Sequence, residues 1–92
     1  MKIMMVGGVN DSKAKKLIKL VKDQCGSELD IVNVNIFTQK PIEEEAKENP
    51  DVIVMLNKQS FDFKTPTVDG LALIYPQMGQ KKVFEEIKNY MG

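Results

Sequence analysis

The sequence predicts an α/β fold in which strands and helices alternate and the strands form one parallel sheet. Short apolar runs at residues 3–6, 30–36 and 51–56 are separated by segments whose apolar residues recur every three or four positions, as in helices. Such alternation is typical of a three-layer sandwich with a four-stranded parallel sheet. The chain has 92 residues and no linker or repeat, so one domain is expected over residues 1–92.

The first strand is expected at residues 3–6, a continuous apolar run that suits a strand covered on both faces. Two glycines end it, and three residue types that favour a helix N-cap follow at Asn10, Asp11 and Ser12. The next helix has apolar residues at helical spacing, namely Ala14, Leu17, Ile18, Val21 and Cys25. Gly26 favours a C-cap for this helix.

The second strand, at residues 30–36, alternates apolar residues with asparagines. This pattern indicates one covered and one partly exposed face, as at the edge of a sheet. Pro41 suits the first position of a short helix, which Asn49 and Pro50 end. Residues 51–56 follow as the third strand, and they are expected to be the most buried of the three.

The C-terminal part of the chain is expected to contain a loop, a fourth strand and a last helix. Residues 57–65 are polar and predict the loop, and one or two short extended pieces are expected within residues 66–75. A turn at residues 76–79 precedes a helix at about residues 80–91. The apolar residues on one side of that helix are Val83, Phe84, Ile87, Tyr90 and Met91. Right-handed crossovers between parallel strands favour the strand order 2-1-3-4.

The composition excludes several kinds of chemistry. Thirteen lysines balance thirteen acidic residues, so no nucleic-acid or membrane surface is expected, and no arginine is present to grip a phosphate bidentately. The chain has no histidine, so no Ser/His/Asp or Cys/His set can form, and no metal or cofactor is expected. A single cysteine, with no signal-peptide pattern and no apolar run of membrane-spanning length, predicts a cytoplasmic protein.

The loop after the first strand is the candidate ligand or phosphate loop. The expected strand order places a switch point beside it, between strands one and three, and ligands of open α/β sheets bind at such points. Glycines allow close approach of the backbone, and amide groups at a helix N-terminus favour an anion. The loop residues are Gly7, Gly8, Val9, Asn10, Asp11 and Ser12. A plain turn with an N-cap is the alternative, since neither a G-x-G-x-x-G nor a P-loop pattern is present.

Three lysines in the first turn of the helix, Lys13, Lys15 and Lys16, are candidates for binding a partner. The helix dipole disfavours cations there, and a locally unfavourable choice can indicate function. The alternative is a solvated face on which Asp11 and Lys15 form a pair. Cys25 is interpreted as a small packing residue, because it lies near the helix C-terminus, where a thiol is not activated.

The order and lengths of these elements resemble the IIB components of the bacterial sugar phosphotransferase system, above all the galactitol type. KIMMVG resembles the family's first strand, and TPTVDGLALIYPQMGQKKVFEEIKNYMG resembles its last strand region and closing helix. Cys25 matches a non-catalytic cysteine of the family. The resemblance spans nearly the whole chain and implies a flavodoxin-like, IIB-like domain. It also implies IIA and IIC components or a regulatory protein as partners, with the membrane reached only through a partner.

In this family a cysteine after the first strand accepts a phosphoryl group from the IIA component and passes it to sugar at the IIC component. The position of that cysteine corresponds to Gly7, and Gly8 follows as a family glycine would. Ser12 is the nearest hydroxyl. The family's run of hydroxyl residues is replaced by Lys13, Ala14 and Lys15.

The resemblance therefore implies a IIB-like domain that lacks phosphocysteine chemistry and acts by binding partners. Two alternatives remain open. The chain could be an active phosphoryl carrier with an unusual acceptor, Asp11 or Ser12. It could also be a small-anion or nucleotide-binding module that contacts phosphate through residues 7–12.

Overall fold

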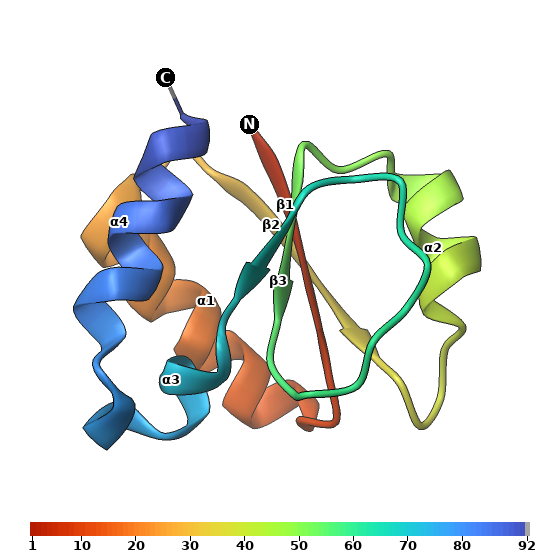
Figure 1. The fold of residues 1–92 in the computed structure, drawn as a ribbon, viewed down its shortest axis with the longest axis horizontal. Helices are drawn as coiled ribbons and strands as arrows, with labels where there is room; N and C mark the ends of the chain where they lie inside the picture. The colour runs from red at the N-terminus through yellow and green to blue at the C-terminus, as the bar shows by residue number, and fades with distance from the viewer. Residues whose placement is uncertain (92) are drawn as a thin grey trace.

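The computed structural model describes residues 1–91, and residue 92, the end of the predicted domain, lies outside the described part. The elements in chain order are β1 (Lys2–Gly7), α1 (Asp11–Cys25), β2 (Asp30–Asn35), α2 (Pro41–Glu48), β3 (Val52–Met55), β4 (Thr67–Asp69), α3 (Leu71–Ile74), the 3₁₀ helix η1 (Pro76–Met78) and α4 (Gln80–Tyr90) (Figure 1). The strands pair in the order β2-β1-β3-β4, and every pairing is parallel. The predicted fold class and strand order are confirmed, and the arrangement is consistent with a flavodoxin-like fold.

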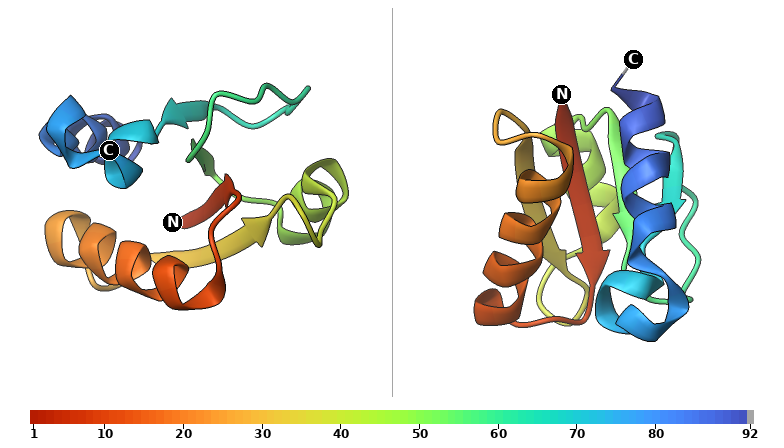
Figure 2. Two further views of the ribbon diagram at one scale, coloured as in Figure 1. Left: turned by 90° about the horizontal axis from the view of Figure 1, so that it is seen from below. Right: turned by 90° about the vertical axis from the view of Figure 1, so that its left-hand side faces the viewer.

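The two faces of the sheet are covered unequally (Figure 2). On one face, a large core cluster joins the sheet to Leu17 of α1, Ala72 of α3 and Ile87 of α4. On the other face, where α2 lies, a smaller cluster has four fully buried members, Met4, Val6, Val34 and Ile53. This second face is completed by half-buried side chains rather than by a second long helix.

Helix α1 begins within the three residues that the sequence offers as N-caps, and it ends at the predicted C-cap. Asn10 is the N-cap, and its Oδ1 accepts a hydrogen bond of 2.9 Å from the backbone N–H of Lys13. Gly26 is the C-cap, with a φ of 155° that favours glycine, and its N–H donates to the Lys22 carbonyl. Both caps satisfy backbone groups that a helix end leaves without partners.

Residues 71–74 differ from the prediction, because they form the short helix α3 rather than an extended piece. Asp69 Oδ1 accepts a hydrogen bond of 3.0 Å from the N–H of Leu71 at the start of this helix. Ala72 and Leu73 are buried in the large core cluster. A short apolar run such as LALI suits a strand or a helix equally, so periodicity could not distinguish them.

Helix α4 is confirmed, and it buries Val83, Phe84 and Ile87. Tyr90 and Met91, predicted on the same side, are instead 47% and 36% exposed. They lie one turn beyond the part of α4 that contacts the core. A periodic pattern identifies the face of a helix, but not how far along the helix the neighbouring elements reach.

Lys2 connects several elements at the amino edge of the sheet. Its Nζ lies 2.7 Å from Glu48 Oε1 of α2 and 4.0 Å from Asp30 Oδ2 of β2. Its backbone N–H donates a bond of 2.7 Å to Asp51 Oδ2, just before β3. The hydrogen bond with Glu48 raises the pKa of Lys2 and lowers the pKa of the Glu48 carboxyl. These contacts stabilise the edge opposite to the candidate loop.

Candidate functional site

The candidate loop lies at the carboxyl edge of the sheet, as predicted. Strand β1 pairs with β2 on one side and with β3 on the other, so the loop after β1 lies beside the switch point of the sheet. Gly7 is the last residue of β1 and is buried, whereas Gly8 is exposed. The chain then turns directly into α1.

Gly7 has no room for a side chain. A Cβ atom built on Gly7 would lie 2.7 Å from the Cβ atom of Leu56, well inside the normal contact distance of carbon atoms. Leu56 is 3% exposed and belongs to the large core cluster. Its N–H also donates a bond of 2.8 Å to the carbonyl of Val6. Because its backbone is held in this way, Leu56 cannot move aside without disturbing the sheet.

Gly8 lies beneath an aromatic ring. A Cβ atom on Gly8 would meet Cε2 of Phe37 at 2.6 Å, and Phe37 is itself 79% exposed. The N–H of Phe37 donates a bond of 2.9 Å to Asn35 Oδ1 in the turn after β2. Sequence reasoning did not select Phe37, although an aromatic residue in an otherwise polar turn was a signal that could have found it.

The N-terminus of α1 already uses part of its capacity to bind an anion. The Lys13 N–H donates to the side chain of Asn10, and the Ala14 N–H donates to the Asn10 carbonyl at 2.9 Å. Val9 packs against the large core cluster, so it contributes to the fold rather than to an open site. Asn10, Asp11 and Ser12 are exposed. The loop geometry therefore resembles a capped βα turn with an accessible polar rim.

Lys13, Lys15 and Lys16 are all exposed on the first turns of α1. None of them forms an ion pair with any residue from 1 to 91, so the expected Asp11–Lys15 pair is absent from the described chain. Further along the helix, Lys19 Nζ does pair with Asp23 Oδ2, at 2.7 Å. The three lysines thus leave their charge available at the carboxyl edge.

Cys25 lies at the opposite end of α1 from the loop. It is half-buried against the large core cluster, and its Sγ lies 3.7 Å from the carbonyl oxygen of Phe84. Burial raises the pKa of the thiol, with a smaller opposing effect from Lys88. A thiol in this state is a packing group and not an activated nucleophile.

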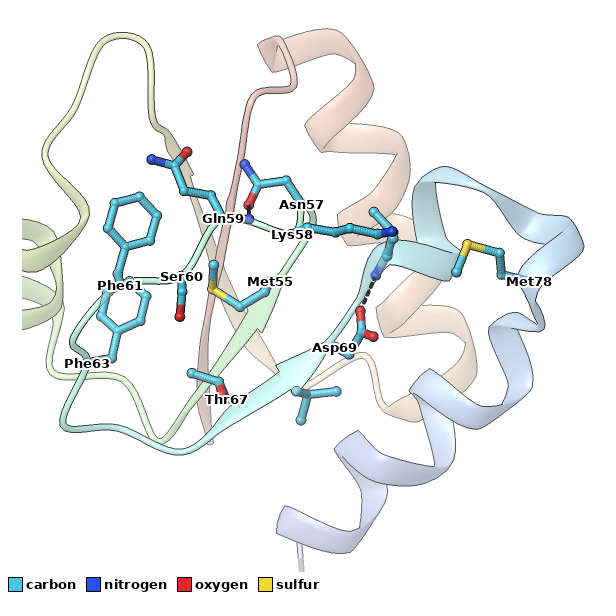
Figure 3. A pocket seen from close by; sticks show the side chains of 12 residues that line it. Met55, Asn57, Lys58, Gln59, Ser60, Phe61, Phe63, Thr67, Asp69 and Met78 are labelled. Carbon is cyan, nitrogen blue, oxygen red and sulfur yellow. Dashed lines mark hydrogen bonds between the residues drawn. The ribbon is translucent and has the colours of Figure 1, made fainter.

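A cavity lies at the same edge, over β3 and β4, beside the segment that the sequence predicts as a loop. The cavity measures about 380 Å³ (Figure 3). Its lining includes Met55 at the end of β3, Phe61 and Phe63 of the following segment, and Asp69 at the end of β4. None of the residues 7–12 lines it.

Within residues 1–91, no helix is both long and apolar enough to cross a lipid bilayer. No three His, Cys, Asp or Glu side chains of that same region gather as metal ligands would.

Comparisons of the chain with protein-family models, with curated proteins and with solved structures found no match. The geometry of the carboxyl edge is therefore the basis for a functional proposal.

Proposed function

We propose that this chain is a IIB-like domain that does not carry a phosphoryl group at residue 7 and that acts by binding a IIA or IIC component or a regulatory protein. The observation that carries this proposal is the close packing of Leu56 against Gly7. A Cβ atom at residue 7 would lie only 2.7 Å from the Cβ atom of Leu56. Phosphocysteine chemistry needs a thiolate that projects from the loop. Core packing occupies the direction in which such a side chain would have to leave the backbone.

The same edge offers features that suit partner binding. Phe37 is a large aromatic side chain that is 79% exposed, and such residues often supply much of the energy of an interface. The exposed Lys13, Lys15 and Lys16 complement an acidic surface and would speed its association. A cytoplasmic location is part of the proposal, and the free thiol of Cys25 is compatible with a reducing compartment.

Exposure to a complete phosphotransferase relay tests the loss of chemistry. The full chain is incubated with a phosphorylated galactitol-type IIA component, and its intact mass is measured. We expect no stable phosphoryl adduct. An adduct would contradict the proposal, and loss of that adduct in Asp11→Asn or Ser12→Ala would identify an unusual acceptor in the loop.

Binding is tested by titrating the ¹⁵N-labelled chain with unphosphorylated IIA component and following the amide resonances. We expect shifts in residues 7–12 and around Phe37, and a loss of affinity of about tenfold or more in Phe37→Ala. Tyr90→Ala is the matched control, because Tyr90 is an exposed aromatic at the last position of α4. That end of α4 lies beside the N-terminus of the chain, where β1 begins (Figure 1).

Two results would contradict the binding proposal. The first is that none of the IIA, IIC or regulatory components of such a system shifts the carboxyl-edge resonances. The second is that Phe37→Ala and Tyr90→Ala weaken binding equally. Shifts of residues 7–12 with inorganic phosphate alone would instead support the anion-binding alternative.

A further inference from the structure

The cavity over β3 and β4 exists because the crossover between these strands contains no helix. Parallel strands are usually joined through a helix that covers the sheet. Residues 56–66 make this connection as an irregular segment, so the second face of the sheet stays partly open above Met55. All three residues of β4, Thr67, Val68 and Asp69, line the same cavity, and the two exposed ones, Thr67 and Asp69, alternate with the buried Val68.

One half of the cavity is apolar and aromatic. In Figure 3, Met55 lies near the middle of the cavity lining, and Phe61 and Phe63 form a wall on one side of it. The two ring centroids are 5.5 Å apart and the rings are tilted by 44°. All three side chains are only half-buried, so they present surface to a ligand. Tilted aromatic rings and a thioether favour contact with another planar ring.

The other half carries two opposite charges. Lys58 and Asp69 both line the cavity and are both exposed, and they lie on the side of Met55 away from the phenylalanines (Figure 3). Neither forms an ion pair within residues 1–91. Asp69 uses Oδ1 to accept the Leu71 N–H, and this leaves Oδ2 for another donor.

We propose that this cavity binds a small zwitterion with a planar apolar body, namely an aromatic α-amino acid. Lys58 would hold the carboxylate, Asp69 would hold the ammonium group, and the ring would pack against Phe61 and Phe63. Asn57 adds a donor, since its Oδ1 already accepts the Gln59 N–H at 3.2 Å and its amide NH₂ remains available. A volume of about 380 Å³ is within the range of small-molecule sites, and the carboxyl ends of parallel strands are where open α/β sheets bind ligands.

This site is distinct from residues 7–12 and does not rest on the proposed partner binding. Its selectivity has a simple physical basis. A ligand that lacks either charge would leave Lys58 or Asp69 without its partner, and a ligand without a ring would leave the aromatic wall uncovered. The proposal therefore predicts a specific order of affinities among small compounds.

The first experiment compares three ligands on the full ¹⁵N-labelled chain by NMR titration. L-phenylalanine carries both charges, 3-phenylpropionate lacks the ammonium group, and phenethylamine lacks the carboxylate. We expect saturable shifts of residues that line the cavity with L-phenylalanine, and about tenfold weaker binding of either other compound. No saturable shift, or equal affinity for all three compounds, would overturn the proposal.

The second experiment assigns each charge to its residue. Lys58→Gln should weaken L-phenylalanine about tenfold and leave phenethylamine unchanged. Asp69→Asn should weaken L-phenylalanine similarly and leave 3-phenylpropionate unchanged. Asparagine keeps an oxygen for the Leu71 N–H, so α3 should stay in place.

Matched controls come from the same segment of the chain. Lys64→Gln and Asp62→Asn remove charges that do not line the cavity, so L-phenylalanine should bind these variants as it binds the unchanged chain. Equal weakening in the controls would overturn the assignment of Lys58 and Asp69. If a variant fails to fold, as judged by its amide spectrum, the ligand series on the unchanged chain still decides the proposal.

Discussion

Two neighbouring glycines at the carboxyl edge meet very different surroundings. Gly7 is buried, and the atom nearest to its Cβ position is the Cβ of Leu56, which belongs to the core. Gly8 is exposed, and the nearest atom is the far end of the Phe37 ring, which is 79% exposed. The Cβ atom of Leu56 is packed in the core and cannot move aside, whereas the exposed ring of Phe37 can rotate into solvent.

We therefore expect Gly7→Ala and Gly8→Ala to differ in stability. Gly7→Ala should lower the free energy of unfolding by about 1–3 kcal/mol, because it overpacks the contact with Leu56. Gly8→Ala should change it by less than about 0.5 kcal/mol, because Phe37 can move. Urea denaturation of both variants measures the difference, and equal losses would show that the Leu56 contact is not restrictive.

At the scale of elements, α2 and the crossover segment of residues 56–66 hold each other in place. Glu45 Oε2 of α2 accepts hydrogen bonds from the N–H groups of Lys64 at 2.9 Å and Thr65 at 2.8 Å. Burial alone would raise the pKa of Glu45, but these backbone donors outweigh it, and the pKa lies below its ordinary value of 4.5. The helix otherwise contributes little apolar packing, since its Ile42 is 44% exposed.

Removing this link should loosen the segment that forms the aromatic wall of the cavity. In Glu45→Ala we expect faster hydrogen exchange at the Lys64 and Thr65 amides and a loss of about 1–2 kcal/mol in unfolding free energy. Glu45→Gln keeps one acceptor oxygen and should give a smaller effect. Glu43→Ala is the control, because Glu43 is exposed and its nearest cation, Lys40, is 3.9 Å away. Unchanged exchange in Glu45→Ala would contradict this account.

At the scale of the whole molecule, the amino and carboxyl edges of the sheet differ in the contacts and exposed groups that they carry. The amino edge is held together by Lys2, which contacts Asp30, Glu48 and Asp51. The carboxyl edge carries the exposed Phe37, the exposed lysines in the first turns of α1 and the open cavity. The ion pairs of Lys2 thus lie at the opposite end of the strands from Phe37 and the cavity.

The titrating groups predict how stability depends on pH. Glu45 and Glu48 have lowered pKa values, so their contribution is present above the unfolded value of 4.5 and is lost as pH falls through the folded values. Lys2 and Cys25 have raised pKa values. Their contributions are present below the unfolded values of 10.5 and 9.0 and are lost as pH rises through the folded values.

We therefore expect the free energy of unfolding to be nearly constant from about pH 6 to pH 8, since the chain contains no histidine. It should decrease below about pH 4.5 and above about pH 9. Urea denaturation across this range measures the profile. The acid decrease should be shallower in Glu45→Gln and Glu48→Gln, and a steep change between pH 6 and pH 8 would contradict the assignment.

Local signals were enough to predict much of the fold. The caps at Asn10 and Gly26 depend on hydrogen bonds within a few residues. The C-cap at Gly26 was predicted, and the N-cap is one of the three candidates at residues 10–12. The alternating asparagines of β2 predicted an edge strand, and β2 does lie at an edge of the sheet. The position of the candidate loop followed from strand order, which obeys the handedness of parallel crossovers.

The sequence alone thus determined the alternation of elements, the parallel sheet and the absence of a thiol or imidazole in the first loop. Three features were decided only by the tertiary structure. Leu56 leaves no space for a side chain at Gly7, the Phe37 ring lies against Gly8, and a cavity opens above Met55. The physical reason is the distance along the chain over which the interactions act. Caps and periodicity act between neighbours in the chain, whereas these features arise where segments far apart in sequence are packed together by the core.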